Sequence, residues 1–438
     1  MRRDYFMKKL LQLKLKIFAK LILWKYKPRI IGITGSVGKT SAKEAVYTVL
    51  ASKYNVRRSS GNYNNEIGLP LTIIGAESPG KNIGGWVAVV LRAVRLILLR
   101  DRSYPRILIL EMGVDRPKDM KYLLKIVKPY IGIVTKVDAV HLENFKKLSD
   151  IKEEKERLVA GLDKDGWAIL NIDDQSVAGM KNKAAAKKIT YGFNKKADIT
   201  ADYVNFSYSG NSRDINNLQG ISFKVSYQGA VVPILMPRSL GTGQVYAALA
   251  AVAVGGIYGI NMVEAAQALK KFNPPKGRTN LIKGIKNSII IDDSYNAAPA
   301  STSVALDLLS KVPLAAGRRR VAVLGDMLEL GYMSIKSHQE IGRQAARLGI
   351  DILITVGERA RDIARAAEKA GTDGNHIFNF DNSDEAKKFI EDRIKPGDLI
   401  LVKGSQRIRM EKIVKEIMAE PEQAGELLVR QSKEWLKK

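Results

Sequence analysis

Short apolar runs alternate with helix-like segments from residue 29 onward, and this alternation constrains the fold more than any other feature. Strands that are apolar throughout and separated by helices form parallel sheets, with binding residues at the carboxyl ends of the strands. The sequence therefore predicts an α/β protein with mainly parallel sheets. The eight runs that read as buried strands are Ile30–Thr34, Ile107–Leu110, Ile131–Val137, Ala168–Asn171, Ile289–Ile291, Val321–Leu324, Ile352–Val356 and Leu399–Val402.

Three parts of the chain differ in composition. Asn273 to Gly277 contains two prolines and a glycine, which is typical of a linker. We therefore predict a basic helix over 1–28, a central domain over 29–275 and a C-terminal domain over 276–438. Within the central domain, 197–237 alternates in short steps and favours an antiparallel insert. The apolar run 245–254 is too short to cross a membrane, so it predicts a buried helix.

Charge and composition exclude several classes of protein. Lysine and arginine exceed aspartate and glutamate by 72 − 45 = 27, and residues 1–29 hold ten basic residues against one acid. No motif interleaves aromatic and basic residues, so a nucleic-acid partner is not expected. Cysteine is absent, which excludes disulfides and thiolate zinc sites and fits a reducing cytosol.

The N-terminal segment predicts a basic amphipathic helix over 5–26. Its apolar side chains recur in steps of three and four, so they share one face of the helix. Such a helix either lies on an anionic membrane surface or packs against the protein's own body or a partner protein. The residues of this face are Phe6, Leu10, Leu13, Ile17, Leu21 and Trp24.

A glycine-rich turn follows the first strand. Gly35-Ser-Val-Gly-Lys-Thr40 matches a loose phosphate-binding pattern, because Ile33 stands where the strict P-loop has glycine. Backbone N–H groups of such a turn bind phosphate oxygens, assisted by the N-terminus of the next helix. Lys39 would neutralise the β- and γ-phosphates, and Thr40 or Ser41 would offer a hydroxyl to Mg²⁺. The turn predicts nucleotide binding.

Other polar residues stand where predicted strands end. Glu111 follows Ile107–Leu110 and is a candidate magnesium ligand. Asp292 and Asp293 end another strand and suggest a polar site. From the residues alone, His141 is more typical of a structural histidine, and Lys155 of an exposed helix face.

Taken in order, these motifs resemble the Mur ligase family. The resemblance implies a P-loop central ATPase domain with a mainly parallel sheet, followed by a Rossmann-like α/β C-terminal ligase domain. The motifs that carry it are Gly32–Thr40, Asn62–Thr72, Glu111–Gly113, Val140–Glu143, Leu170–Asp174, Gly277–Arg278, Ile291–Pro299, Leu324–Gly331 with His338, and Val402–Ser405.

The resemblance also implies an activity: ATP-dependent amide bond formation through an acyl phosphate. The motifs are most similar to members that add D-alanyl-D-alanine to a UDP-N-acetylmuramoyl-tripeptide in peptidoglycan precursor synthesis. Another Mur-type amide ligase, polyglutamate-type or cell-envelope, and a non-catalytic ATP-binding scaffold are the alternatives. The expected location is the cytoplasm, either free or peripherally at the inner face of the membrane.

The resemblance implies residue roles as well. Expected catalytic residues are Lys39, Lys155, His141 and Arg278. Expected ATP contacts are Gly35, Ser36, Gly38, Lys39, Thr40, Ser41, Gln244, Arg278 and Asp293. Two Mg²⁺ ions are expected on Thr40, Glu111, His141 and Lys155, with Lys155 carbamylated. Expected substrate contacts are Asn62, Asn64, Asn65, Thr72, Asn296, Asp326, His338 and Lys403.

The sequence departs from the family pattern in four places. Only the basic helix precedes the phosphate turn, so the family's UDP-sugar-binding domain is expected to be missing or replaced. The family's Gly-x-His-Asn-x-x-Asn corresponds here to Gly241 to Ala247, where the histidine and both asparagines are replaced, by Gly243, Gln244 and Ala247. Lys118 stands where the family has glycine, and Lys136 where it commonly has asparagine.

Overall fold

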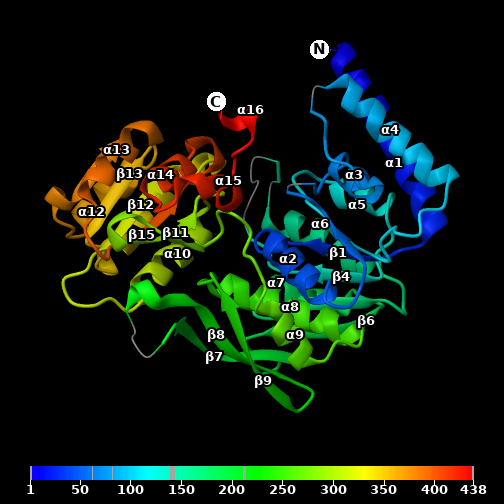
Figure 1. Ribbon diagram of the computed structural model, residues 1–438, viewed down its shortest axis with the longest axis horizontal. Coiled ribbons are helices and arrows are strands. Elements are labelled where there is room, and N and C mark those ends of the chain that lie inside the picture. Colours follow the sequence, from blue (N-terminus) through cyan, green and yellow to red (C-terminus); the bar gives the residue numbers. More distant parts are fainter. Residues whose placement is uncertain are drawn as a thin grey trace. The chain divides into compact units, whose positions relative to one another are not determined.

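The computed structural model describes residues 2–61, 63–80, 82–138, 144–145, 147–210 and 214–436. The chain forms two compact units, and Figure 1 follows it from one end to the other. The first unit comprises Met1–Tyr203, Phe223–Ile234 and Gly243–Phe272, and the second comprises Val204–Ser222, Leu235–Thr242 and Asn273–Lys438. The domain boundaries drawn from the sequence stay predictions.

A nine-stranded sheet has the order β2-β3-β1-β4-β5-β6-β7-β8-β9. Neighbours from β2 through β7 pair in parallel, as the apolar strand pattern predicts. The strand that begins at Ile131 ends at Val134, before the expected Val137. The strands are β1 Arg29–Thr34, β2 Val56–Arg58, β3 Ile107–Glu111, β4 Ile131–Val134, β5 Trp167–Asn171, β6 Lys187–Gly192, β7 Ile199–Tyr208, β8 Leu218–Tyr227 and β9 Ala230–Pro237.

The last strands of this sheet correspond to the predicted insert. β8 and β9 are joined by Gln228 and Gly229, both with positive φ (50° and 80°). A two-residue loop with two positive φ values is typical of a tight hairpin between antiparallel strands. The alternation over 197–237 therefore reflects strands β7 to β9.

The helices of this part include the predicted basic helix and the predicted buried helix. α8 is rich in alanine and almost wholly buried, which confirms the interpretation of the uncharged run. Within the described residues, no helix is long and apolar enough to cross a membrane. The helices are α1 Arg2–Tyr26, α2 Lys39–Leu50, α3 Gly68–Ile74, α4 Ile83–Leu98, α5 Asp119–Leu124, α6 Leu148–Ala160, α7 Gln175–Ala178, η1 Gly179–Asn182, α8 Thr242–Ile257 and α9 Met262–Leu269. η2 Ile215–Asn217 lies in a stretch that belongs to the second unit.

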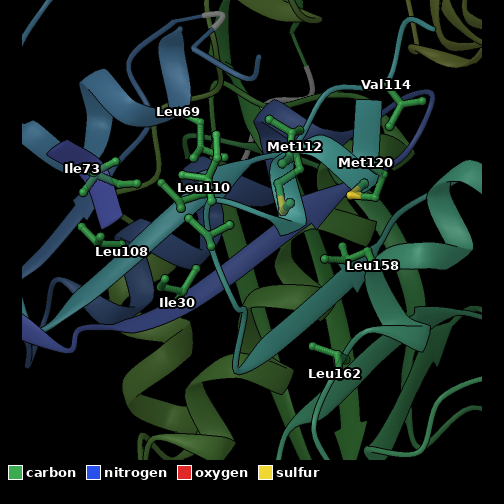
Figure 2. Close-up of a cluster of buried hydrophobic side chains, with 14 of the residues drawn as sticks. Ile30, Leu69, Ile73, Leu108, Leu110, Met112, Val114, Met120, Leu158 and Leu162 are labelled. Carbon is green, nitrogen blue, oxygen red and sulfur yellow. The ribbon is translucent and has the colours of Figure 1, made fainter. Parts of the chain in front are cut away.

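One large apolar cluster covers one face of the sheet at β1 and β3. Figure 2 shows Ile30 and Leu108 of the sheet close to Ile73 of α3, and Met120 of α5 beside Leu158 of α6. Each fully buried aliphatic side chain contributes roughly 1.5–3 kcal/mol. β1 and β3, which lead to the phosphate turn and to Glu111, are therefore anchored to the core along this face.

The second unit contains a six-stranded sheet with the order β10-β11-β15-β12-β13-β14. β10 is antiparallel to β11, and the other pairs are parallel. The elements are β10 Asn280–Lys283, η3 Ile285–Asn287, β11 Ile289–Asp293, α10 Pro299–Lys311, β12 Arg320–Gly325, η4 Gly331–Met333, α11 Ser334–Arg347, β13 Ile352–Val356, α12 Arg361–Lys369, η5 Gly374–His376, β14 Ile377–Phe380, α13 Ser383–Arg393, β15 Leu399–Lys403, η6 Gln406–Ile408, α14 Glu411–Ile417, η7 Pro421–Gln423, α15 Ala424–Leu427 and α16 Lys433–Leu436.

Both faces of this sheet are covered. Leu399 and Leu401 belong to one apolar cluster, whereas Ile400 and Val402 belong to another. Because successive strand residues point to opposite faces, the uninterrupted apolar run of β15 serves both clusters. This doubly covered parallel sheet is the Rossmann-like arrangement expected for the C-terminal domain.

Candidate active site

The glycine-rich turn between β1 and α2 favours glycine at two positions. Gly35 has φ +151°, and a Cβ there would lie 2.0 Å from Oγ1 of Thr135. Gly38 has φ +87° and is the N-cap of α2, which begins at Lys39. Left-handed backbone at these positions favours glycine because a Cβ would be strained.

The turn is held in shape by the segment that follows β4. The backbone N–H of Ser36 donates to the carbonyl of Lys136 (2.6 Å), and the Ser36 hydroxyl donates to the carbonyl of Asp138 (3.0 Å). Oγ1 of Thr135 donates to the carbonyl of Val37 at 2.6 Å. The backbone of the turn is therefore preorganised before any phosphate arrives.

Lys39 lies across this turn. Its ammonium group donates to the carbonyl oxygens of Gly35 (2.7 Å) and Ser36 (3.4 Å). The positive charge of Lys39 therefore lies beside the turn and next to the N-terminus of α2, where backbone N–H groups favour an anion. This arrangement suits the terminal phosphates of a nucleotide.

Thr40 and Glu111 meet beside the turn. The Thr40 hydroxyl donates a hydrogen bond of 3.1 Å to Oε2 of Glu111 at the end of β3. The Glu111 carboxylate is buried, and its backbone N–H donates to the Ser59 hydroxyl. Because Ser41 is buried and Thr40 faces the carboxylate, the geometry favours Thr40 as the metal-binding hydroxyl.

Lys43 is a functional candidate that the sequence interpretation missed. Its side chain is 1% exposed, and its Nζ lies 3.5 Å from Glu111 Oε2 and 3.6 Å from Glu44 Oε1. Its ammonium also donates to the carbonyl of Gly61. The only local signal is spacing, since Lys43 is four residues after Lys39 and so shares its face of α2, but this spacing does not show that Lys43 is buried.

Lys155 is buried on α6, so the interpretation as an exposed helix face is wrong. Burial, and then the nearby charge of Lys39, lower the pKa of Lys155 to about 7. A substantial fraction of this amine is therefore neutral near pH 7. The fold places it within electrostatic range of the phosphate turn.

The donors near the turn fit a magnesium ion. Mg²⁺ usually binds one or two protein oxygens together with substrate phosphates and water, and Thr40 and Glu111 supply such oxygens. His141 and Asn62 lie outside the described residues. Among the residues that are described, no three His, Asp or Glu side chains gather as a metal site.

The predicted substrate loop before α3 is held by its own side chains. Oδ1 of Asn65 accepts the backbone N–H groups of Ile67 and Gly68, which caps the start of α3. The Thr72 hydroxyl donates to the Gly68 carbonyl within that helix. The carbonyl of Asn64 accepts the N–H of Gly113, two residues after Glu111. The loop is thereby attached beside the candidate metal ligand.

The segment that departs from the family pattern around Gln244 also contains an aromatic side chain, Tyr246. Gln244 is buried in the first turn of α8, and two residues later the Tyr246 hydroxyl donates to Oδ2 of Asp173 at 2.9 Å. The Tyr246 ring also meets Phe193 edge-on at 5.1 Å. This segment is therefore tied to the ends of β5 and β6.

Backbone geometry shows why the family has glycine where this chain has Lys118. Lys118 is the N-cap of α5 and has φ +76°. Glycine adopts this left-handed conformation freely, whereas a residue with a Cβ is strained there. The chain therefore keeps the turn that the family builds with glycine. Nothing in the structure explains the replacement at Lys136, whose Nζ lies 3.3 Å from Asp138.

In the second unit, the buried Lys403 pairs with the half-buried Asp293. Lys403 Nζ donates to Oδ2 of Asp293 at 2.6 Å and to the carbonyl of Asn296 at 2.9 Å. Oδ1 of Asp293 accepts the N–H of Thr279. The guanidinium group of Arg278 lies 4.1 Å from the centre of the Tyr295 ring. These contacts bring four of the predicted residues together at the ends of β11 and β15.

Asp326 and His338 are also neighbours in this unit, but their polar atoms bind backbone. His338 is buried; its Nε2 accepts the N–H of Met327 (3.0 Å), and Nδ1 is 2.8 Å from the Ser334 carbonyl. Oδ1 of Asp326 accepts the N–H of Ala360, and burial raises the pKa of its carboxyl. Both residues hold the segment after β12.

A preorganised glycine turn, a lysine over it and a hydroxyl–carboxylate pair at parallel strand ends define a P-loop nucleotide-binding protein. Residues 33–83 and 93–255 match the model of the Mur ligase middle domain, and residues 277–406 match that of the Mur ligase glutamate ligase domain. The chain belongs to the Mur ligase family, whose members are ATP-dependent enzymes that form amide bonds.

The most similar relatives have one name, UDP-N-acetylmuramoyl-tripeptide–D-alanyl-D-alanine ligase. The one from Bacillus subtilis (strain 168) is 29% identical over 93% of this chain and 79% of its own. The one from Mycobacterium tuberculosis (strain CDC 1551 / Oshkosh) is 32% identical, over 86% of this chain and 70% of its own.

Solved structures agree on the fold. A crystal structure of MurF from Acinetobacter baumannii has a TM-score of 0.74 at 25% identity, covering 92% of this chain and 79% of that one. MurF ligase from Thermotoga maritima, solved in complex with ADP, has a TM-score of 0.75 at 24% identity and covers 94% and 84%. The predicted family and fold class are confirmed.

Proposed function

We propose that the chain is an ATP-dependent ligase that joins D-alanyl-D-alanine to UDP-N-acetylmuramoyl-tripeptide in peptidoglycan precursor synthesis. The observation that carries the proposal is the Thr40–Glu111 pair beside the preorganised turn, in a chain whose relatives have this activity by name. We further propose that it acts in the cytoplasm, where ATP is available.

The reaction has two balanced steps. An oxygen of the tripeptide carboxylate bonds to the γ-phosphorus of ATP, the bond to the β–γ bridging oxygen breaks, and ADP leaves. The amine of D-alanyl-D-alanine then bonds to the acyl carbon, inorganic phosphate leaves, and the nitrogen loses a proton. Lys39 and the N–H groups of the turn would bind the phosphates and favour the charge on the transferring group.

Magnesium, when bound, would offset the negative charge of the phosphates. We propose that Thr40, Glu111, His141 and a carbamylated Lys155 hold two ions. Gln244, Arg278 and Asp293 would contact the nucleotide. We also propose that the substrates contact the residues expected from the sequence, which are Asn62, Asn64, Asn65, Thr72, Asn296, Asp326, His338 and Lys403.

Carbamylation of Lys155 is supported by its surroundings. A neutral amine attacks CO₂, forms an N–C bond and loses a proton, which leaves an anionic oxygen ligand. Burial and the neighbouring positive charge of Lys39 both favour that neutral form. Protein equilibrated with ¹³C-bicarbonate should show a carbamate carbon resonance that Lys155→Ala removes. A resonance unchanged by Lys155→Ala would contradict the assignment.

Phosphate release by the purified chain tests the activity. With ATP and Mg²⁺, release is expected only when UDP-muramyl-tripeptide and D-alanyl-D-alanine are both present. Release with glutamate-containing acceptors instead would indicate a polyglutamate-type ligase. ATP binding without release under any of these conditions would indicate a non-catalytic scaffold.

A further inference from the structure

We propose that α1 and α4 together form a preformed docking surface for an anionic lipid bilayer. Both helices belong to the first unit and run side by side (Figure 1). The proposal concerns where the protein is located and does not depend on its ligase activity.

α1 has two apolar faces, and only one is buried. Leu15, Ala19 and Ile22 are buried in the core cluster that also contains α3 side chains. At 100° per residue, the stripe expected from the sequence lies on the opposite side of the helix. That stripe is exposed, with Trp24 at 77%; its described members are Leu10, Leu13, Ile17, Leu21 and Trp24.

α4 repeats the same arrangement. Val89, Ala93 and Leu96 are buried in the same cluster as the α1 residues. A second stripe recurs in steps of three and four on the other side of the helix, so it also points away from α3. Its members are Ile83, Val87, Leu91, Val94 and Leu98, all exposed. Two parallel apolar stripes thus face away from the core.

The two helices are fastened to each other. The Lys25 ammonium donates to the carbonyls of Leu96, Ile97 and Leu99, which caps the C-terminal end of α4 with a positive charge. The Tyr26 hydroxyl donates to the carbonyl of Leu96, and its ring stacks on Tyr104, in the segment after α4, with 4.2 Å between ring centres. The surface is therefore rigid before it meets a partner, which lowers the entropy cost of binding.

Charge identifies the occupant. Residues 9–29 and 82–106 hold twelve lysines and arginines against one carboxylate, Asp101. Lys9, Lys14 and Lys20 are exposed along the edges of the α1 stripe, and Arg92 and Arg95 along α4. Apolar stripes edged by basic side chains match the acyl chains and anionic headgroups of a membrane surface. A second copy of the chain docked on this face would bring like positive charges together, so charge favours the bilayer over self-association.

α1 and α4 can enter a bilayer only to a shallow depth. No described helix can span a bilayer, and both helices have one face committed to the core. The exposed stripes therefore lie at the headgroup level, where an exposed tryptophan is favoured. Trp24 provides a direct probe of that position.

Vesicle binding by the full-length chain tests the proposal. Co-sedimentation is expected with vesicles of phosphatidylcholine plus phosphatidylglycerol, at low salt, and not with phosphatidylcholine alone. Val87→Glu has a matched control in Val263→Glu, because both are helical valines with 54% exposure. Val87→Glu should weaken binding roughly tenfold, and Val263→Glu should leave it unchanged. Equal effects of the two variants would overturn the proposal.

Two further measurements keep the test independent of folding defects. Ile17→Glu on α1 should weaken binding as Val87→Glu does, with an unchanged circular dichroism spectrum. Trp24 emission should shift to shorter wavelength on the anionic vesicles, and Trp24→Phe should remove that shift. Failure of the unmodified chain to bind these vesicles would overturn the proposal. A dimer that Val87→Glu dissolves, with no vesicle binding, would instead assign the face to self-association.

Discussion

The hydroxyl of Thr40 donates a 3.1 Å hydrogen bond to Oε2 of Glu111, although 71 residues separate them in the chain. The contact exists because β1 and β3 are parallel neighbours, so the residues that follow them meet at one edge of the sheet. A hydroxyl and a carboxylate beside a phosphate turn are the protein oxygens that Mg²⁺–ATP requires.

Removing the charge of Glu111 should impair phosphate transfer. Glu111→Gln is expected to lower phosphate release roughly 100-fold, because the metal loses its charged protein ligand. The measurement is phosphate release across a magnesium titration. Glu153→Gln, which changes an exposed carboxylate on α6, is the control. Equal rates for the two variants would refute a metal-binding role.

Loss of the buried Lys43 ammonium should destabilise the first unit. Lys43→Met leaves Glu111 without its cation, and breaking a buried pair costs roughly 3 kcal/mol of unfolding free energy. Lys53→Met breaks the exposed pair with Glu264 and should cost about 0.5 kcal/mol. Urea unfolding of both variants checks the difference, and similar losses would argue against a buried ion pair.

The stability of the second unit should depend on pH through Asp292. Burial raises the pKa of this carboxyl from 3.8 to about 6, so the folded form holds its proton more tightly than the unfolded form. The contribution of Asp292 to the free energy of unfolding therefore falls as pH rises from about 4 to 6. Above pH 6 the folded protein bears the full cost of a buried, charged carboxylate. Asp292→Asn should raise the unfolding midpoint above pH 6 and make little difference near pH 4. A difference independent of pH would contradict this account.

Glycine at position 118 should stabilise the chain. Lys118→Gly relieves a left-handed backbone that costs a side chain about 1–2 kcal/mol, less the extra entropy that glycine loses on folding. The expected net gain in unfolding free energy is about 0.5–1 kcal/mol. Lys121→Gly, within α5, should instead cost about 1 kcal/mol. Thermal unfolding of the pair distinguishes the two effects.

Much of the site could be predicted from local patterns. The phosphate turn follows an apolar strand, and Glu111 ends another, so parallel pairing alone brings them to one edge. Lys155 required the family resemblance, because a run of charged residues looks the same whether one member is buried or not. Lys43 was missed for the same reason. Its burial depends on Glu111 and Gly61, which are remote in sequence.

The predicted substrate residue His338 shows another limit of sequence interpretation. Both of its ring nitrogens lie within hydrogen-bond distance of backbone atoms in its own segment. A motif match cannot distinguish a side chain that shapes a loop from one that contacts a ligand. Whether His338 also contacts substrate stays a prediction.

By itself the sequence determined eight strands of the two sheets, their parallel arrangement and the glycine turn, because apolar runs and left-handed backbone are local requirements. The short strands β2, β6, β10 and β14 were not predicted. Only the tertiary structure decided which apolar face of α1 packs and which stays exposed. Leu15 and Leu13 are equally apolar, yet one is buried and the other is not. The difference arises from α3 and α4, which cover one side of the helix and leave the other to solvent.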